Sequence, residues 1–397
     1  MREENLVIPR LFRDAVRKSP AKTALQIRRE NSWIKITYKE LEEHSLKVSA
    51  FLIKQGFKKN DAAAIILENR PEWAMIYLGI TCAGLVCVPI DTQLNQHEIN
   101  NLISDSNVKV IFCSYDIFTK KIKQGMAGNP AKIIVLDAPE PNSENLARFT
   151  DIEIITPDIN ALPDIFPQDI ASLIYTSGTT AEPKGVLLSH ANICSNYNSI
   201  IKLGLASSLD NALPILPLHH TYAFMVTLIT PLFLGATVTY CPTLSPQELI
   251  ETIREGGVTI LVGVPQLFLM LHKGISERAR KIPFLLSPFS LILVRIAVRR
   301  QWGRKLRLLV SGGARLDPEI ARDLSRLLGI RIIEGYGLTE TSPVVSLNPL
   351  EKIKFGSVGR PIPGVQVKII NPDTGGAGQI LIKGPNVMQG YFKHPEW

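Results

Sequence analysis

The sequence predicts an α/β protein with two doubly wound αβ sub-domains and a small β sub-domain at its C-terminal end. Strand and helix patterns alternate along the first half, which is typical of parallel sheets with helices on both faces. The alternation restarts after a Pro- and Asp-rich stretch at 142–169, and short strands with glycine-rich turns take over from about Phe355. We therefore place the sub-domains at 1–168, 169–350 and 351–397.

The elements of the first sub-domain follow from capping signals and short apolar runs. Thr37 and Glu40 form a capping box, which predicts a helix over 38–54. Pro71 and Asn95 mark the starts of two further helices. The expected strands are the apolar runs 62–67, 85–90, 108–113 and 133–136.

The second sub-domain repeats this alternation. We expect a helix that begins near Ser189, an apolar helix around 224–234, and a helix started by a second capping box of Ser245 and Glu248. The expected strands are 170–175, 212–215, 237–240, 259–262, 306–311 and 331–334. In the last sub-domain, the runs 365–370 and 379–383 flank a glycine-rich turn and predict a β-hairpin.

Composition limits the classes of function. The net charge of +8 favours anionic partners such as nucleotides, CoA or a membrane surface, but no basic helix or aromatic-and-basic module indicates nucleic acid. The five cysteines are scattered among apolar residues without a CxxC pair, which argues against a disulfide framework or a zinc site. The N-terminus lacks the apolar core of a signal peptide, so we expect a cytoplasmic protein. The sequence leaves the oligomeric state open.

The most apolar stretch is 282–298, which is flanked by arginines and lysines. It contains Pro283, Pro288 and Arg295 and is shorter than the roughly 20 apolar residues of a membrane span. Two interpretations remain: a buried helical hairpin, or a helix that makes peripheral contact with the inner face of a membrane.

The segment Tyr175-Thr-Ser-Gly-Thr-Thr-Ala-Glu-Pro-Lys-Gly185 carries the clearest chemical signal. A buried strand delivers a loop rich in hydroxyls and glycine, and we expect a helix to follow. Such a loop can present backbone N–H groups, hydroxyls and an ammonium group to an anion, although a hydrophilic surface loop has the same composition. Because Lys184 is followed by glycine, this is not a Walker loop. The candidate phosphate ligands are Thr176, Ser177, Gly178, Thr179, Thr180 and Lys184.

This string resembles the signature loop of the adenylate-forming (AMP-binding) superfamily, which includes acyl-CoA synthetases, peptide-synthetase adenylation domains and luciferases. The resemblance is closest to bacterial long-chain fatty acid–CoA ligases and covers almost the whole chain. It implies that the loop surrounds the β- and γ-phosphates of ATP. Further motifs follow in the family's order. In Pro217-Leu-His-His220, the resemblance places His220 between the acyl pocket and the nucleotide, with His219 where an aromatic residue often stands.

Two glycine-containing motifs are similar to the family's nucleotide pocket. Ser311-Gly-Gly-Ala314 would place Gly312, Gly313 and Ala314 against adenine and the acyl-adenylate. In Glu334-Gly-Tyr-Gly-Leu-Thr-Glu340, the residues Glu334, Gly335, Tyr336, Gly337 and Thr339 would contact the nucleotide. Tyr336 can stack on adenine, and Thr339 can donate to the α-phosphate. Glu340 is a hard oxygen ligand suited to Mg²⁺, and the resemblance offers Thr176 as a second Mg²⁺ contact. The third glycine of a dinucleotide fingerprint is absent, so we exclude NAD.

The resemblance implies an acid–thiol ligase that converts a fatty acid and ATP to acyl-AMP and pyrophosphate, then forms a thioester with CoA. Lys184, His220, Thr339 and Glu340 would be the catalytic residues. Amino-acid-activating relatives carry an acid just after the histidine motif, whereas 221–226 contains none, which favours an apolar acid. The alternatives are a fatty-acyl-AMP ligase or acyl-carrier-protein synthetase, and a non-catalytic nucleotide- or lipid-binding protein.

The last segment resembles the family in part. Gly384-Pro-Asn-Val-Met-Gln-Gly-Tyr-Phe392 matches the RGPxxxxGY motif, with Lys383 in place of arginine. The family's ribose-binding Asp, hinge and small C-terminal catalytic domain would follow Trp397. From the sequence we therefore expect this polypeptide to bind ATP weakly and to adenylate inefficiently.

Overall fold

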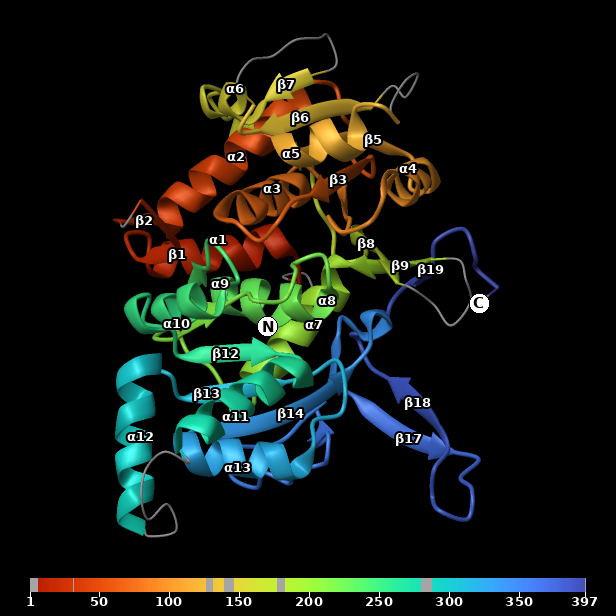
Figure 1. Ribbon diagram of the computed structural model, residues 1–397. Helices are drawn as coiled ribbons and strands as arrows, with labels where there is room; N and C mark the ends of the chain where they lie inside the picture. The colour runs from red at the N-terminus through yellow and green to blue at the C-terminus, as the bar shows by residue number, and fades with distance from the viewer. Residues whose placement is uncertain are drawn as a thin grey trace.

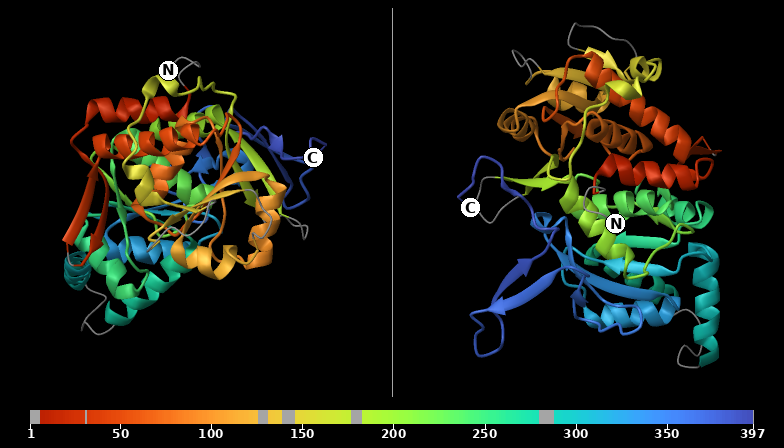
Figure 2. Two further views of the ribbon diagram at one scale, coloured as in Figure 1. Left: turned by 90° about the horizontal axis from the view of Figure 1, so that it is seen from above. Right: turned by 180° about the vertical axis from the view of Figure 1, so that it is seen from behind.

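The computed structural model describes residues 6–30, 32–125, 131–138, 146–176, 183–279 and 288–396. Two twisted sheets lie one above the other, with helices between and around them, and a separate β-hairpin projects from the lower one (Figure 1). The view from behind shows the same hairpin standing away from the body (Figure 2). The α/β class that the sequence predicts is confirmed.

The helices begin where the capping signals predict. The longer ones are α1 (Ile8–Lys18), α2 (Tyr38–Lys54), α3 (Pro71–Cys82), α4 (Gln96–Asp105), α7 (His190–Ile201), α10 (Pro246–Glu255), α11 (Pro265–Ala279), α12 (Pro288–Trp302) and α13 (Pro318–Leu328). The shorter ones are α5 (Tyr115–Ile117), η2 (Phe118–Ile122), α6 (Phe149–Glu153), η3 (Ile159–Ala161), α8 (Thr221–Ala223), η4 (Phe224–Ile229), α9 (Thr230–Leu234) and η5 (Thr339–Thr341). At the start of α2, Thr37 accepts from the Glu40 N–H while Glu40 accepts from the Thr37 N–H, as the capping box requires.

The upper sheet has eight strands in the order β19-β9-β8-β4-β3-β5-β6-β7. Their bounds are β3 (Ala62–Ile66), β4 (Val86–Pro89), β5 (Val108–Ser114), β6 (Lys132–Leu136), β7 (Leu146–Arg148), β8 (Ile170–Thr176), β9 (Lys184–Ser189) and β19 (Gly390–Tyr391). The strands from β8 to β7 pair in parallel, while β8–β9 and β9–β19 are antiparallel. The expected helix after the Gly/Thr loop is therefore preceded by a strand: the apolar run that ends at Ser189 pairs with β8 before α7 begins.

The lower sheet has nine strands in the order β16-β15-β14-β13-β12-β10-β11-β1-β2. Their bounds are β1 (Thr23–Arg29), β2 (Ser32–Thr37), β10 (Asn211–Leu213), β11 (Thr237–Tyr240), β12 (Ile260–Gly263), β13 (Leu308–Ser311), β14 (Arg331–Gly337), β15 (Val344–Leu347) and β16 (Arg360–Pro361). The strands from β14 to β1 are parallel. The third sheet is the hairpin of β17 (Gln366–Ile370) and β18 (Gln379–Lys383), as the sequence predicts.

The sheets do not follow the predicted sub-domain boundaries. Strands β1 and β2 precede residue 168 but pair with β11 of the lower sheet, whereas β8 and β9 follow it and pair in the upper sheet. Within 351–397, the strands β16, β17–β18 and β19 belong to three different sheets. Local sequence patterns give the position of a strand but not its neighbours, because pairing is decided by contacts between distant segments.

One hydrophobic core joins the two main sheets. Helices α1, α7 and α9 lie between the sheets, and their apolar residues belong to the same buried cluster as those of both sheets (Figure 1). Two further clusters cover the outer faces, one beneath α4 and one beneath α10 to α13. All five cysteines are buried among these apolar residues, as expected. The two sheets therefore form one packed body.

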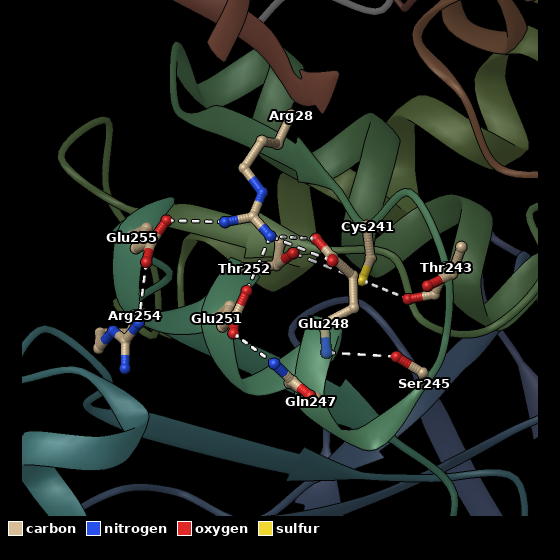
Figure 3. A network of polar contacts seen from close by, with 10 residues as sticks. All are labelled: Arg28, Cys241, Thr243, Ser245, Gln247, Glu248, Glu251, Thr252, Arg254 and Glu255. Carbon is tan, nitrogen blue, oxygen red and sulfur yellow. Dashed lines mark hydrogen bonds and ion pairs between the residues drawn. The ribbon is translucent and has the colours of Figure 1, made fainter. Parts of the chain in front are cut away.

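Arg28 of β1 joins the edge of the lower sheet to α10 (Figure 3). Its guanidinium donates to Glu248 at 2.9 Å, to Glu251 at 2.8 Å and to Glu255 at 2.9 Å. These acceptors bind the guanidinium so closely that the pKa of Arg28 is raised. The predicted capping box of Ser245 and Glu248 is only half formed, because the Glu248 carboxylate binds Arg28 while Ser245 still accepts from the Glu248 N–H.

Helix α12 lies at the outer edge of the lower sheet, away from the upper one (Figure 1). Its described residues include Trp302, which is buried, and Ile292 and Ile296, which are 52% and 47% exposed. The segment 282–287, for which the sequence leaves two interpretations, lies outside the described residues. In the part of the chain that the structure describes, no helix combines the length and apolar character needed to cross a bilayer.

Candidate functional site

A cavity of about 470 Å³ lies above the carboxyl ends of the central strands of the lower sheet. Its floor is made by β12, β13 and β14, which contribute Ile260, Val262, Leu308, Val310 and Ile333. Helix α7 and the helical segment from α8 to α9 cover it from the opposite side. The edge formed by the carboxyl ends of parallel strands is where α/β folds hold their ligands, and this volume suits a small molecule.

The cavity brings together the second half of the predicted site. The predicted residues that line it are His220, Gly312, Gly313, Gly335, Tyr336, Gly337 and Thr339. Ala314 is exposed and does not line it. Glu334 is buried behind β14, where its Oε1 accepts from the Gly356 N–H at 3.0 Å. Ser177, Gly178, Thr179 and Thr180 lie outside the described residues.

Two of these glycines are required by close packing. A Cβ on Gly337 would lie 1.8 Å from the carbonyl oxygen of Pro343, which is backbone and cannot move aside. A Cβ on Gly312 would lie 2.6 Å from the ring of Tyr222. Tyr222 donates to the Val310 carbonyl at 3.3 Å, and burial raises the pKa of its phenol. The mouth of the cavity therefore has no room for larger residues at these positions.

His219 and His220 form a contacting pair at the cavity rim. Their Nε2 atoms are 3.2 Å apart, so one ring must donate an N–H to the lone pair of the other. Burial and the neighbouring His220 lower the pKa of His219 to about 4, although Asp91 lies 3.6 Å away and opposes this shift. Burial also lowers the pKa of His220. Both rings are therefore neutral at pH 7, and His220 can act as a hydrogen-bond donor or acceptor facing the cavity.

Asn69 fixes the segment that carries the histidine pair. Its side-chain amide donates to the carbonyls of Pro214 and Leu216 at 2.9 and 2.8 Å, and its Oδ1 accepts from the Leu218 N–H at 2.9 Å. Asn69 comes from the loop after β3 of the upper sheet. Residues from both sheets thus hold the rim of the cavity.

Lys184, Thr176 and Glu340 form a second group beside the cavity rather than in its lining. Thr176 and Lys184 are paired residues of β8 and β9, at the base of the Gly/Thr loop. Tyr391 donates to Glu340 Oε1 at 2.8 Å, and the Lys184 Nζ lies 5.5 Å from the centre of the Tyr391 ring. Burial, followed by the contact with Glu340, raises the pKa of Tyr391 to about 12. Its phenol is therefore a proton donor at neutral pH.

Sequence reasoning missed three residues of this site. Tyr391 belongs to the RGPxxxxGY-like segment, whose match to the family was noticed without a contact to Glu340 being inferred. Asn69 precedes a helix start and was interpreted as part of that signal. Tyr222 was assigned to an apolar helix. In each case the missing information was which distant segment the side chain meets.

Comparison with known proteins agrees with this geometry. The family model described as "AMP-binding enzyme" matches residues 12–392. Over 425 residues the chain is 27% identical to a long-chain-fatty-acid–CoA ligase of Bacillus subtilis (strain 168), covering 99% of this chain and 71% of that protein. It is 28% identical to 4-coumarate–CoA ligase 2 of Solanum tuberosum, covering 91% of this chain and 64% of that protein.

Solved structures show the same fold. The crystal structure of apo MatB from Rhodopseudomonas palustris superimposes with a TM-score of 0.81 at 28% identity, covering 99% of this chain and 72% of that one. A long-chain-fatty-acid-CoA ligase (FadD1) from Archaeoglobus fulgidus gives a TM-score of 0.81 at 19% identity, covering 100% of this chain and 78% of that one. At that identity the second likeness concerns the fold alone.

Proposed function

The chain belongs to the AMP-binding enzyme family of adenylate-forming acyl-CoA ligases, and from this premise we propose that it activates a fatty acid and transfers it to CoA. In the first step, a carboxylate oxygen attacks the α-phosphorus of ATP and pyrophosphate leaves. In the second, the thiolate of CoA attacks the acyl carbon of the mixed anhydride and AMP leaves. The protein contributes by holding the reactants and by stabilising charge.

The observation that carries the fatty acid is the lining of the cavity. Among the described residues that line it, none carries a charge. The ammonium of an amino acid, or the second carboxylate of a dicarboxylic acid, would be buried there without an ionic partner, at a cost of several kcal/mol. A hydrocarbon chain instead gains about 0.8 kcal/mol for each buried methylene. The apolar floor between Ile260 and Val310 therefore favours an alkyl chain.

The polar residues at the rim would hold the nucleotide. We assign Tyr336 to the adenine ring, and Thr339 and His220 to the α-phosphate and the reacting carboxylate. Thr339 and neutral His220 can each donate one hydrogen bond to the charge that develops on the phosphorus oxygens. The close packing at Gly312 and Gly337 leaves backbone rather than side chains facing the bound base.

The second group of residues would hold the β- and γ-phosphates. Lys184 supplies a positive charge at the base of the Gly/Thr loop, and Glu340 and Thr176 supply oxygen ligands. No cluster of three or more His, Cys, Asp or Glu side chains in the described ranges could bind a metal by itself. Mg²⁺ usually takes one or two carboxylates together with substrate phosphates and water, so this donor set fits it. When bound, the ion would neutralise phosphate charge.

The proposal is tested with the chain itself and a series of acids. Isothermal calorimetry with butyrate, octanoate, dodecanoate and palmitate should show affinity rising about fourfold per methylene until the cavity is full. Pyrophosphate release with ATP and Mg²⁺ should follow the same order, whereas succinate and glutamate should be inactive. Tighter binding of 4-coumarate or benzoate than of any fatty acid would show that the substrate is an aryl acid.

A cavity-filling variant sharpens this test. Val226 lines the cavity from η4, so Val226→Phe should shorten the longest acid that binds without weakening butyrate. Val358 is 46% exposed, and Val358→Phe is the matched control with an unchanged chain-length profile. The acceptor is tested in the same assay: CoA and a phosphopantetheinyl carrier protein are offered to the adenylate, and thioester on the carrier alone would favour the acyl-carrier-protein alternative. A chain that binds ATP but forms no adenylate would favour the non-catalytic alternative.

We also propose that α12 makes peripheral contact with an anionic membrane surface. Ile292 and Ile296 are exposed one turn apart, and the exposed Arg299 and Arg300 follow them. Apolar side chains beside basic ones suit the interface of an anionic bilayer. Flotation with phosphatidylglycerol vesicles should recover the protein, and serine at both isoleucines should abolish this. Equal recovery with neutral vesicles, or none with either, would contradict the proposal.

A further inference from the structure

We propose that Tyr391 is a positioning residue that fixes the Glu340 carboxylate beside Lys184 and so sets how tightly magnesium-bound ATP is held. The inference rests on the proposed function, because it takes Glu340 as the residue facing the cation. It concerns a segment near the end of the chain that sequence analysis left without a role.

The contact with Glu340 leaves one carboxylate oxygen available. The Tyr391 hydroxyl donates to Oε1 at 2.8 Å. Among the described residues, no donor contacts Oε2. A hydrogen bond to one oxygen restricts the rotation of the carboxylate and thereby orients the other. An oriented carboxylate binds a cation without first losing side-chain freedom.

The same ring also lies beside Lys184. The Lys184 Nζ is 5.5 Å from the ring centre, within the range of a cation–π contact. Strand β19 brings the ring there, since Tyr391 is the antiparallel partner of Val186 and the Phe392 N–H donates to the Gly185 carbonyl at 2.7 Å. Tyr391 is therefore in contact with both charged groups that we assign to the triphosphate.

Backbone contacts hold Tyr391 between these two groups. The Met388 N–H donates to the Glu340 carbonyl at 2.8 Å, and the buried Asn386 side chain donates to the Thr341 carbonyl at 2.8 Å. On the other side, the Gln389 N–H donates to the Leu187 carbonyl of β9 at 2.9 Å. The segment 386–392 thus joins η5, which carries Glu340, to the strand that carries Lys184.

Tyr391→Phe tests the inference, because it removes the hydroxyl and keeps the ring beside Lys184. ATP affinity is measured by calorimetry across a range of Mg²⁺ concentrations. We expect the Mg²⁺ concentration at half-maximal effect to rise about three- to tenfold, as for loss of a hydrogen bond to a charged group at a partly exposed site. ATP affinity without Mg²⁺ should stay within about twofold of wild type, because the ring contact remains.

A double-mutant cycle separates positioning from general stability. If Tyr391 acts through Glu340, adding Tyr391→Phe to Glu340→Ala should produce no further change in the Mg²⁺ dependence. Tyr38→Phe is the matched control: it removes a buried phenol that donates to the Ala236 carbonyl at 2.6 Å, remote from Glu340, and should lower the melting temperature without moving the Mg²⁺ midpoint.

Three outcomes would overturn the inference. A wild-type Mg²⁺ dependence in Tyr391→Phe, or an effect of Tyr391→Phe that persists in the Glu340→Ala background, would overturn it alone. Failure of the wild-type chain to bind ATP at any Mg²⁺ concentration would overturn the proposed function and this inference together.

Discussion

The cavity floor and the β17–β18 hairpin are built from the same kinds of residue but differ in what surrounds them. Strands β12, β13 and β14 are paired on both sides and covered by helices, so Val262 is 1% exposed. The hairpin strands pair with each other alone among the described residues, and Val367, Ile369 and Ile380 are 37%, 45% and 44% exposed. β-Branched residues thus form a packed, shape-defining surface in one region and an open one in the other.

This difference shows where the molecule stores its stability. Removing an atom or adding a charge changes the free energy of unfolding in proportion to the contacts that are lost or the solvation that is denied. A two-stranded hairpin in water is marginal by itself, so its residues contribute little to the cooperative unit. Paired substitutions, one in each region, test this directly.

The largest difference should come from a buried charge. Val262→Asp places a carboxylate in the uncharged cavity floor and should destabilise by at least about 3 kcal/mol, whereas Ile369→Asp in the hairpin should cost less than about 0.5 kcal/mol. Urea unfolding followed by circular dichroism measures both. Equal losses would mean that the hairpin belongs to the cooperative core.

Acid should destabilise the body through a buried histidine. His190 accepts the Ile8 N–H on Nδ1 at 3.3 Å, and burial lowers its pKa to about 4. The unfolded chain therefore binds a proton first as pH falls below about 6.5, so stability is lost from there towards pH 4, on the order of 3 kcal/mol in all. His190→Gln should flatten the dependence of the urea midpoint on pH in this range, while the exposed His97→Gln should not. The hairpin contains no histidine and should contribute nothing to this slope.

Two glycines separate steric overlap from backbone strain. Gly337→Ala must displace the Pro343 carbonyl and should cost about 2 kcal/mol as well as weaken ATP binding, since Gly337 lines the cavity. Gly376 in the hairpin turn has φ +83° and no atom within 4 Å of an added Cβ, so Gly376→Ala should cost about 1 kcal/mol or less of local strain. Thermal unfolding and ATP calorimetry distinguish them. A larger loss for Gly376→Ala would reverse the order that the packing predicts.

The smallest difference concerns two loop anchors. Asn69→Ala removes three hydrogen bonds from the rim of the cavity and should cost about 1–2 kcal/mol. Asp373 accepts the N–H groups of Gly375 and Ala377 at 2.9 Å in the exposed hairpin turn, and Asp373→Ala should cost less than about 0.5 kcal/mol. Comparable losses from the two alanines, measured by urea unfolding, would show that Asn69 is not an anchor.

Local sequence signals located most of the elements. The capping residues Thr37 and Asn95 start their helices where expected, and the hairpin forms around its glycine-rich turn. The rim residues from Gly335 to Thr339 also lie together at the cavity, because one strand end carries them. These features depend on residues that are close in sequence.

Features decided by distant contacts were not predictable in the same way. The Glu248 carboxylate bonds Arg28 rather than the start of its own helix, and the partner is 220 residues away. Likewise, Tyr391 meets Glu340 because β19 adds to the sheet beside β9. A local pattern cannot report an ion pair or a strand neighbour of this kind.

The Arg28 contacts have a consequence for the order of events in synthesis. In β1, Gln26 bonds Thr239 and the Gly256 carbonyl, which follow it by 213 and 230 residues. At about 5–20 residues per second, β1 leaves the ribosome roughly 10 to 40 s before its partner strand exists. During that interval an edge strand with an unsatisfied arginine waits in an incomplete protein. The late arrival of β11 and α10 therefore sets the earliest time at which the lower sheet can close, and any chaperone that shields β1 must act before then.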